Sequence, residues 1–352
     1  MDTVRILSID GGGIRGIIPL KVLEYIEEVT GQQIHQLFDV VGGTSTGGII
    51  ALGLNSKLPG TNEIYTAKQL LDFYTSPEDI KQIFQVENST LVDKILNFVR
   101  RILHILPEDH GPGFLAAEYS SQSINNFLQS KFGQHTKLSQ LPTECDVSVF
   151  SYDIENASPY YFNNHQALQN CEDDYYVWQA ARATSAAPTY FSAEEVDNLK
   201  QQRRVLVDGG VFINNPTLEM LIRAKELYPN AKKYLLVSLG TGEFTQKYTN
   251  LNNAGVVNWL WLGAPLVNIS MTGVSMALDQ QLQKLKKEIS GLDYQRYQQP
   301  LTENIGLDDA KPETISLLQK LGAELVEQNQ KQLKNLCKEL SLPLKIKEHH
   351  YA

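Results

Sequence analysis

The chain has 352 residues, of which 42% are hydrophobic and 20% charged, with 24 glycines and 14 prolines. This composition can bury a substantial core, and it excludes a disordered chain, a collagen-like chain and a small disulfide scaffold. The net charge of -9 gives no general attraction to nucleic acid, so we expect no nucleic-acid partner.

The three cysteines, Cys145, Cys171 and Cys337, are an odd number without metal-ligand spacing. They fit a reducing compartment and argue against a structural zinc site. The N-terminal segment lacks the apolar core of a secretion signal, and the longest uncharged stretch, residues 248–278, is interrupted by polar residues and by Pro265. We therefore expect a soluble, cytoplasmic protein without a signal peptide or transmembrane segment, for which peripheral contact with a membrane is open.

Strand and helix patterns alternate along the chain. A β-rich run at residues 4–9 ends in glycines, and a helical pattern follows from Pro19 to a stop at Gly31. A second strand is predicted at residues 38–41, and another apolar helix begins at Ile49. Three further buried strands are predicted at residues 147–152, 204–207 and 234–239. This alternation implies an α/β fold with a mostly parallel central sheet covered by helices on both faces.

Two longer segments have a helical period. Residues 91–106 form an amphipathic pattern that carries Arg100 and Arg101, and residues 314–340 predict C-terminal helices. No linker rich in proline, glycine or serine separates two halves of the chain. We therefore expect a main domain over residues 1–290 and a helical extension over residues 291–352 that packs on the same domain.

A G-x-S-x-G motif, Gly43-Thr44-Ser45-Thr46-Gly47, lies between an apolar strand and an apolar helix. A sharp strand-to-helix turn exposes the serine, and small flanking residues let the turn close. The N-terminus of the following helix favours the negative charge that develops when a nucleophile attacks a carbonyl group. The motif predicts a nucleophilic Ser45; the alternative is a tight glycine turn with a capping serine.

A second glycine motif, residues 11–16, follows the first strand and matches G-x-G-x-x-G. A dinucleotide-binding turn requires an acidic residue at the end of the second strand, but Asp39 lies at the start of that strand. Consecutive glycine amides could instead form an oxyanion hole, because glycine lets the backbone approach a substrate closely. We favour the oxyanion hole.

Asp208 ends a third strand that runs into a glycine turn. Its carboxylate could accept the Ser45 proton if the fold brings the two together; otherwise it bonds its own backbone, which is common for Asp-Gly. A Ser-Asp-His triad would require a histidine after the acid, where the chain has only His349 and His350 in a polar tail. A Ser–Asp dyad therefore fits better than a triad.

These motifs, DGGGIRG, GTSTGG and VDGGVFINNP, together with residues 183–191 and 238–242, resemble the patatin family of lipid acyl hydrolases over residues 4–290. The resemblance implies a three-layer α/β/α fold with the catalytic domain in residues 1–290. It further implies hydrolysis of phospholipid or galactolipid acyl esters without a metal or cofactor. Carried over by position, Ser45 is the nucleophile, Asp208 the base, and the oxyanion-hole donors are Gly11, Gly12 and Gly13.

Other roles stay open at this point. Arg15 could contact a lipid phosphate or tie the glycine loop to the sheet by an ion pair, and the N–H of Thr46 could join the oxyanion donors. The helix at residues 91–106 and Trp259-Leu260-Trp261 could meet a lipid surface or an acyl chain, or could pack in the core. A membrane lipid is the expected partner, as substrate. The alternatives are a non-catalytic lipid-binding or regulatory protein on the same fold and, less favoured, a dinucleotide-binding protein.

Overall fold

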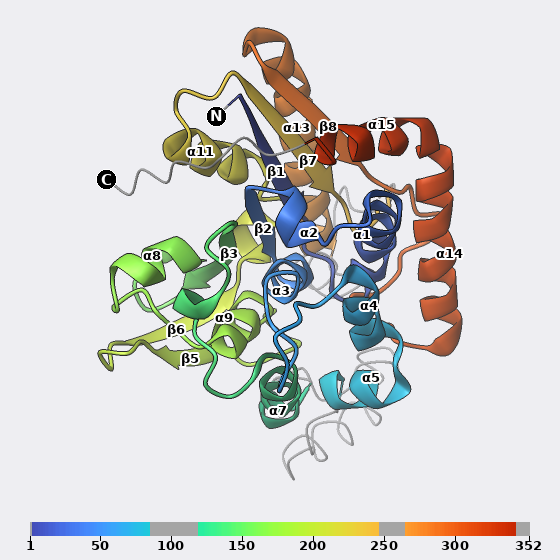
Figure 1. Cartoon of the computed structure of the whole chain (residues 1–352). Coiled ribbons are helices and arrows are strands. Elements are labelled where there is room, and N and C mark those ends of the chain that lie inside the picture. The colour runs from blue at the N-terminus through green and yellow to red at the C-terminus, as the bar shows by residue number, and fades with distance from the viewer. Residues whose placement is uncertain (1, 85–118, 246–264, 343–352) are drawn as a thin grey trace.

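A computed structural model describes residues 2–84, 119–245 and 265–342, and it is built around one eight-stranded sheet (Figure 1). The strand order is β5-β6-β3-β2-β1-β7-β8, and β4 pairs with β3 outside this path. The strands are β1 (Thr3–Ile9), β2 (Val40–Thr44), β3 (Asp146–Asp153), β4 (Ser158–Asn163), β5 (Glu194–Asp197), β6 (Arg203–Asp208), β7 (Lys233–Leu239) and β8 (Leu292–Tyr297).

The sheet is parallel in its centre and antiparallel at one side. The pairings among β1, β2, β3, β7 and β8 are parallel, whereas those made by β4, β5 and β6 are antiparallel. The predicted mostly parallel sheet is therefore confirmed. The sequence predicts all of these strands except β4, β5 and β8, which are short or polar and carry no continuous apolar run.

Helices cover both faces of the sheet, because successive residues of the buried strands point to opposite sides. Leu7 and Ile9 of β1 belong to the larger core, whereas Val4 and Ile6 face a second core with Leu282 of α13. The three-layer α/β/α fold is therefore confirmed. The helices of the larger core include α1 (Ile17–Thr30), α2 (Ile34–Leu37), α3 (Thr46–Gly53), α4 (Ala67–Thr75), α7 (Ser121–Phe132), α8 (Asn164–Gln169), α9 (Val177–Thr184), α14 (Pro312–Gln328) and α15 (Gln330–Leu340); α11 (Thr217–Leu227) and α13 (Pro265–Glu288) cover the other face. Shorter segments are α5 (Pro77–Ile83), α10 (Gly210–Ile213) and the two 3-10 turns η1 (Gly13–Gly16) and η2 (Leu138–Gln140).

The C-terminal segment packs against the start of the chain. In Figure 1, α14 runs beside α1, and the two helices are in contact. The Arg5 guanidinium donates hydrogen bonds to the carbonyl oxygens of Glu339, Leu340 and Leu342, at 3.0, 2.8 and 2.7 Å. These bonds satisfy carbonyl groups that the end of α15 leaves without intrahelical partners. The side chain of Arg5 therefore fastens α15 to β1.

The C-terminal helices predicted at residues 314–340 are α14 and α15, which meet at Asn329. β8 lies beyond residue 290 and extends the central sheet by pairing with β7. The division into a main domain over residues 1–290 and an extension over residues 291–352 stays a proposal. None of the helices in the described ranges combines the length and apolar character needed to cross a bilayer. The predicted helix at residues 91–106 and the segment Trp259-Leu260-Trp261 lie outside the described residues.

Candidate active site

The two motifs around Ser45 and Asp208 meet beside strand β3. Thr44 at the end of β2 pairs with Phe150 of β3, so the next residue, Ser45, is level with Ser151. On the same edge of β3, Ser151 pairs with Asp208, the last residue of β6, while β4 pairs along the opposite edge. Because β6 runs antiparallel to β3, its C-terminal end arrives at the same level as the turn after β2. The sheet therefore brings Ser45 and Asp208 together although they are far apart in the sequence.

The serine stands on the predicted strand–turn–helix, between β2 and α3, and is half-buried. Its backbone angles are φ 56° and ψ -124°, a conformation that residues with a side chain rarely adopt and that often marks a functional site. A Cβ on Gly43 would lie 2.2 Å from the Gly47 carbonyl carbon, and one on Gly47 would lie 2.2 Å from the Ile9 oxygen. Both motif glycines are therefore required by close backbone contacts.

The Ser45 backbone is held from a third segment of the chain. Its N–H donates a hydrogen bond to the Thr184 hydroxyl oxygen at 3.0 Å, and that hydroxyl donates in turn to the Phe150 carbonyl at 2.6 Å. Thr184 is fully buried at the end of α9. This chain of hydrogen bonds connects the strained turn to strand β3.

The Asp208 carboxylate accepts a hydrogen bond from the Gly210 N–H at 2.6 Å, so it is bonded to its own turn. The neighbouring Ser45 hydroxyl also acts on this carboxylate as a donor and lowers its pKa. Only 4% of Asp208 is exposed, and this burial raises its pKa from 3.8 to about 6 against the opposing effect of the two hydrogen bonds. A carboxylate with a pKa near neutrality is suited to act as a general base.

The glycine loop after β1 lies against this dyad. A Cβ on Gly11 would be 3.3 Å from the Ser45 Cβ. The Gly11 N–H, however, donates to the Asn214 carbonyl at 2.9 Å, and the Gly11 carbonyl accepts the Thr241 hydroxyl at 2.7 Å. Within the described residues, the N–H groups of Gly12 and Gly13 have no acceptor. Two of the three expected oxyanion donors are therefore unoccupied, and the third is engaged in holding the loop.

Thr46 follows Ser45 and begins helix α3. Its side chain is 2% exposed, and its hydroxyl shares a 2.6 Å hydrogen bond with the Tyr74 hydroxyl. The hydroxyl is thus committed to the core between α3 and α4. Only the backbone N–H of Thr46, in the first turn of α3, is placed where it could contribute to binding an anion.

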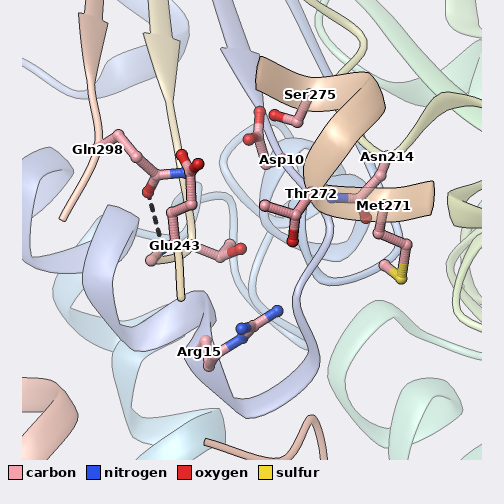
Figure 2. A pocket seen from close by; sticks show the side chains of 10 residues that line it. Asp10, Arg15, Asn214, Glu243, Met271, Thr272, Ser275 and Gln298 are labelled. Carbon is pink, nitrogen blue, oxygen red and sulfur yellow. Dashed lines mark hydrogen bonds between the residues drawn. The ribbon is translucent and has the colours of Figure 1, made fainter. Parts of the chain in front are cut away.

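A polar pocket lies beside the glycine loop, and Figure 2 shows Arg15 and Glu243 pointing into it. Asp10, at the back of this pocket, forms a two-pronged ion pair with Arg296, at 2.6 and 3.2 Å. The carboxylate at the start of the glycine loop is thus paired with Arg296 of β8. Among the described residues no carboxylate lies within ion-pair distance of Arg15, whose Nε donates weakly to the Gly12 carbonyl at 3.4 Å. Burial lowers the pKa of Arg15 to about 10.

Other candidate groups lie elsewhere. Asp39 accepts the Arg5 N–H at 2.9 Å at the amino end of the parallel strands, the end opposite to the glycine loop, so it cannot serve a nucleotide bound there. His165 lies 3.1 Å from Asp146 at the start of β3, about 16 Å along the strand from the level of the dyad. In the parts of the chain that the structure describes, no group of three or more histidine, cysteine or acidic side chains could hold a metal ion.

Four supporting residues were not predicted from the sequence: Thr184, Asn214, Thr241 and Arg296. Thr184, Asn214 and Thr241 occur within family-like segments, so their motifs were visible although their contacts were not. Arg296 lies in β8, in a polar strand without any motif signal. Only the three-dimensional pairing of β7 with β8 brings its guanidinium to Asp10.

The chain was compared with known proteins. The model of the patatin-like phospholipase family matches residues 7–221. Patatin-like protein 2 of Oryza sativa subsp. indica is 31% identical over 359 residues, covering 93% of this chain and 84% of the rice protein. Human calcium-independent phospholipase A2-gamma is 28% identical over 355 residues, covering 96% of this chain but only 40% of the human protein. The solved structure of VipD from Legionella pneumophila covers 94% of this chain and 67% of its own, with a TM-score of 0.39 and 14% identity.

Proposed function

The chain belongs to the patatin-like phospholipase family, and on this premise we propose that it is a phospholipase A-type lipid acyl hydrolase that works through a Ser45–Asp208 dyad. The observation that carries this proposal is the placement of Ser45 beside the buried Asp208 carboxylate, at the edge of β3 where β2 and β6 end. A serine hydroxyl is a weak nucleophile unless a neighbouring base removes its proton, and Asp208 is in the position to do so.

The reaction would begin when Asp208 takes the Ser45 proton and the serine oxygen attacks the carbonyl carbon of a lipid ester. The negative charge then moves to the carbonyl oxygen, where the free N–H groups of Gly12 and Gly13 and the first turn of α3 would stabilise it. Collapse of this intermediate breaks the ester bond. The leaving lysolipid alcohol takes the proton from Asp208, and an acyl-Ser45 remains.

The second half-reaction would release the fatty acid. Asp208, ionised again, takes a proton from a water molecule, whose oxygen attacks the acyl carbonyl carbon. The tetrahedral intermediate breaks toward Ser45, which recovers its proton from Asp208, and the fatty acid leaves. Each step uses the same base and the same amides. No step requires a metal ion or cofactor.

We further propose that Arg15 binds the phosphate of a phospholipid substrate. Its guanidinium faces a pocket next to the glycine loop, lacks a carboxylate partner among the described residues and has been largely removed from water. An unpaired, partly desolvated guanidinium is well suited to bind a phosphate with two parallel hydrogen bonds. Replacing Arg15 with methionine should therefore reduce hydrolysis of phospholipids more than hydrolysis of galactolipids.

The experiment is product analysis by mass spectrometry on vesicles of mixed phospholipids and galactolipids, with wild type and Ser45→Ala measured side by side. The proposal predicts free fatty acid and lysolipid from the wild type only. Equal product from both proteins would show that Ser45 is not the nucleophile. If neither protein forms product and a fluorophosphonate also labels no serine, the result would favour a non-catalytic lipid-binding protein on the same fold.

A further inference from the structure

Ser151 in β3 is a buried residue whose hydroxyl has no hydrogen-bond partner among the described residues. Its exposed fraction is 0%. Burial of a hydroxyl without a hydrogen bond is unfavourable, and most buried polar groups in native proteins have a partner. An unpaired hydroxyl in the middle of the central sheet therefore requires an explanation.

The position of Ser151 suggests the explanation, because it lies directly opposite Asp208 and level with Ser45. One edge of β3 pairs with β2 over residues 146–150 and with β6 over residues 151–153, and the other edge pairs with β4. Through the pairing of Thr44 with Phe150, Ser45 comes level with Ser151, and Asp208 pairs with Ser151 directly. Ser45 and Asp208 thus meet at one edge of β3, at the level of Ser151.

The kind of pairing brings the side chains of Ser151 and Asp208 close. In an antiparallel ladder, hydrogen-bonded pairs alternate with non-hydrogen-bonded pairs, and the two side chains of a non-hydrogen-bonded pair lie closer together. The Ile154 N–H donates to the Val205 carbonyl at 3.0 Å, which makes that pair a hydrogen-bonded one. Three positions along, Ser151 and Asp208 form a non-hydrogen-bonded pair. Consistently, the Asp208 N–H bonds outside the ladder, to the Ala186 carbonyl at 3.0 Å.

The two side chains also share one face of the sheet. Directly opposed residues point to the same side, and residues two positions along a strand do so as well. The ion pair between Asp153 and Arg204, at 3.0 Å, joins β3 and β6 on this face. The Cβ atoms of opposed residues lie about 4.5–5.5 Å apart, which places a carboxylate within reach of a serine hydroxyl.

We propose that Ser151 is a positioning residue for the catalytic base, and that its hydroxyl donates a hydrogen bond to the ionised Asp208 carboxylate when Ser45 cannot. The inference rests on the proposed function. In the acyl-enzyme the Ser45 oxygen carries the acyl group and has no proton to donate, so the carboxylate loses one of its two hydrogen bonds. Rotation of the Ser151 side chain replaces that bond and holds Asp208 in place to activate water.

The charged side chains near Asp208 are already paired, so they do not compete for its carboxylate. On β3 and β6, Asp153 pairs with Arg204, and on α9 Arg182 lies 3.5 Å from Glu194 of β5. The other acidic residues of β5 are exposed, and neither α3 nor α10 contains a charged residue. Asp146, at the other end of β3, pairs with Arg223 at 2.7 Å. Within the described residues, a hydroxyl group is thus the hydrogen-bond donor that remains to adjust the pKa of Asp208.

The test is a carbon-13 NMR titration of the full-length Ser45→Ala protein, in which no Ser45 hydroxyl can bond to Asp208. Its aspartate carboxyl groups are labelled, the Asp208 signal is assigned by its loss in Asp208→Asn, and the Ser151 and Ser148 variants are made in this background. Replacing Ser151 with alanine removes the donor, so we expect the pKa of Asp208 to rise by about half to one unit. With Ser45 present, the acid limb of the kcat profile, which reports the enzyme carrying substrate or acyl group, should move to higher pH by the same amount. Ser151→Cys, which keeps a weaker donor of similar shape, should give an intermediate shift.

Ser148→Ala is the matched control. Ser148 lies on the same strand but on the opposite face, and its hydroxyl accepts a hydrogen bond from Asn163 at 2.9 Å. This variant should lower Tm without moving the Asp208 titration, whereas Ser151→Ala should move the titration without lowering Tm. An unchanged titration in Ser151→Ala, or an equal shift in both variants, would overturn the proposal. The titration does not depend on catalysis. Wild-type protein that fails to hydrolyse lipids would therefore refute the proposed function, while the titration would still test the role of Ser151.

Discussion

Ser45 and Asp208 meet at one edge of strand β3, where only 4% of the surface of Asp208 is exposed. Burial makes the carboxylate a stronger base than an aspartate in water, since it raises the pKa to about 6. The hydrogen bonds from Ser45 and Gly210 limit this rise. The balance keeps Asp208 mostly ionised at neutral pH and yet able to accept a proton.

The pH dependence of hydrolysis should follow this ionisation. The base must be ionised to accept the Ser45 proton, so activity is present above the pKa of about 6 and is lost as the pH falls through it. Below that point, kcat/KM should fall about tenfold for each pH unit. Initial rates on a neutral ester substrate between pH 4 and pH 9 measure this limb. An acid limb centred near pH 4 would contradict the raised pKa of Asp208.

The backbone of Ser45 stores strain that a glycine would release. At φ 56° and ψ -124°, a residue with a Cβ is strained, whereas glycine adopts this conformation readily. Thermal unfolding should therefore show Ser45→Gly to be more stable than Ser45→Ala by about 1 kcal/mol, although both are inactive. Equal Tm values for the two variants would mean that the turn is not strained in solution.

Thr184 holds the nucleophile turn through its hydroxyl, which accepts from the Ser45 N–H and donates to Phe150. In Thr184→Val, the shape is kept but both hydrogen bonds are lost, which should reduce stability by about 1–3 kcal/mol. We also expect kcat to fall, because the turn that presents Ser45 is no longer anchored. Thr184→Ser keeps the hydroxyl and is the control. Wild-type kcat in Thr184→Val would contradict this role.

The buried pair between Asp10 and Arg296 anchors the start of the glycine loop. Removing the cation alone, in Arg296→Met, leaves Asp10 buried without its partner and should cost about 3–5 kcal/mol of stability. The double variant Asp10→Asn/Arg296→Met buries neither charge without a partner, so it should recover most of the lost stability. Denaturant unfolding of Arg296→Met, Asp10→Asn and the double variant measures this coupling. Additive losses would show that the two side chains do not interact energetically.

Much of the fold was predictable because the buried strands are continuous apolar runs that end in glycine turns. β1, β3, β6 and β7 lie within one residue of their predicted positions, and helix α1 ends at the expected Gly31, which has φ 66°. The antiparallel strands β4 and β5 were missed. β4 alternates between faces and β5 is mostly acidic, so neither has the pattern of a fully buried strand.

The candidate site was predictable as a set of residues but not as a set of contacts. The G-x-S-x-G and Asp-Gly turns pointed to Ser45 and Asp208 because each motif has a local reason for its residues. The register that aligns both with Ser151 depends on β6 running antiparallel, which no local pattern encodes. For the same reason, sequence alone could not reveal that the Gly11 N–H donates to the Asn214 carbonyl or that Arg296 is the partner of Asp10.

The most direct test of the dyad is the rate at which a fluorophosphonate labels Ser45 in wild type and in Asp208→Asn at pH 8, with the labelled peptide identified by mass spectrometry. Loss of the base should slow labelling by about 10²–10⁴-fold. Asp208→Asn should keep its Tm at or above that of wild type, because it removes a buried charge. Labelling confined to Ser45, fast in wild type and slow in the variant, is the predicted result. Labelling of Ser45 at equal rates in both proteins would contradict the role of Asp208 as the base.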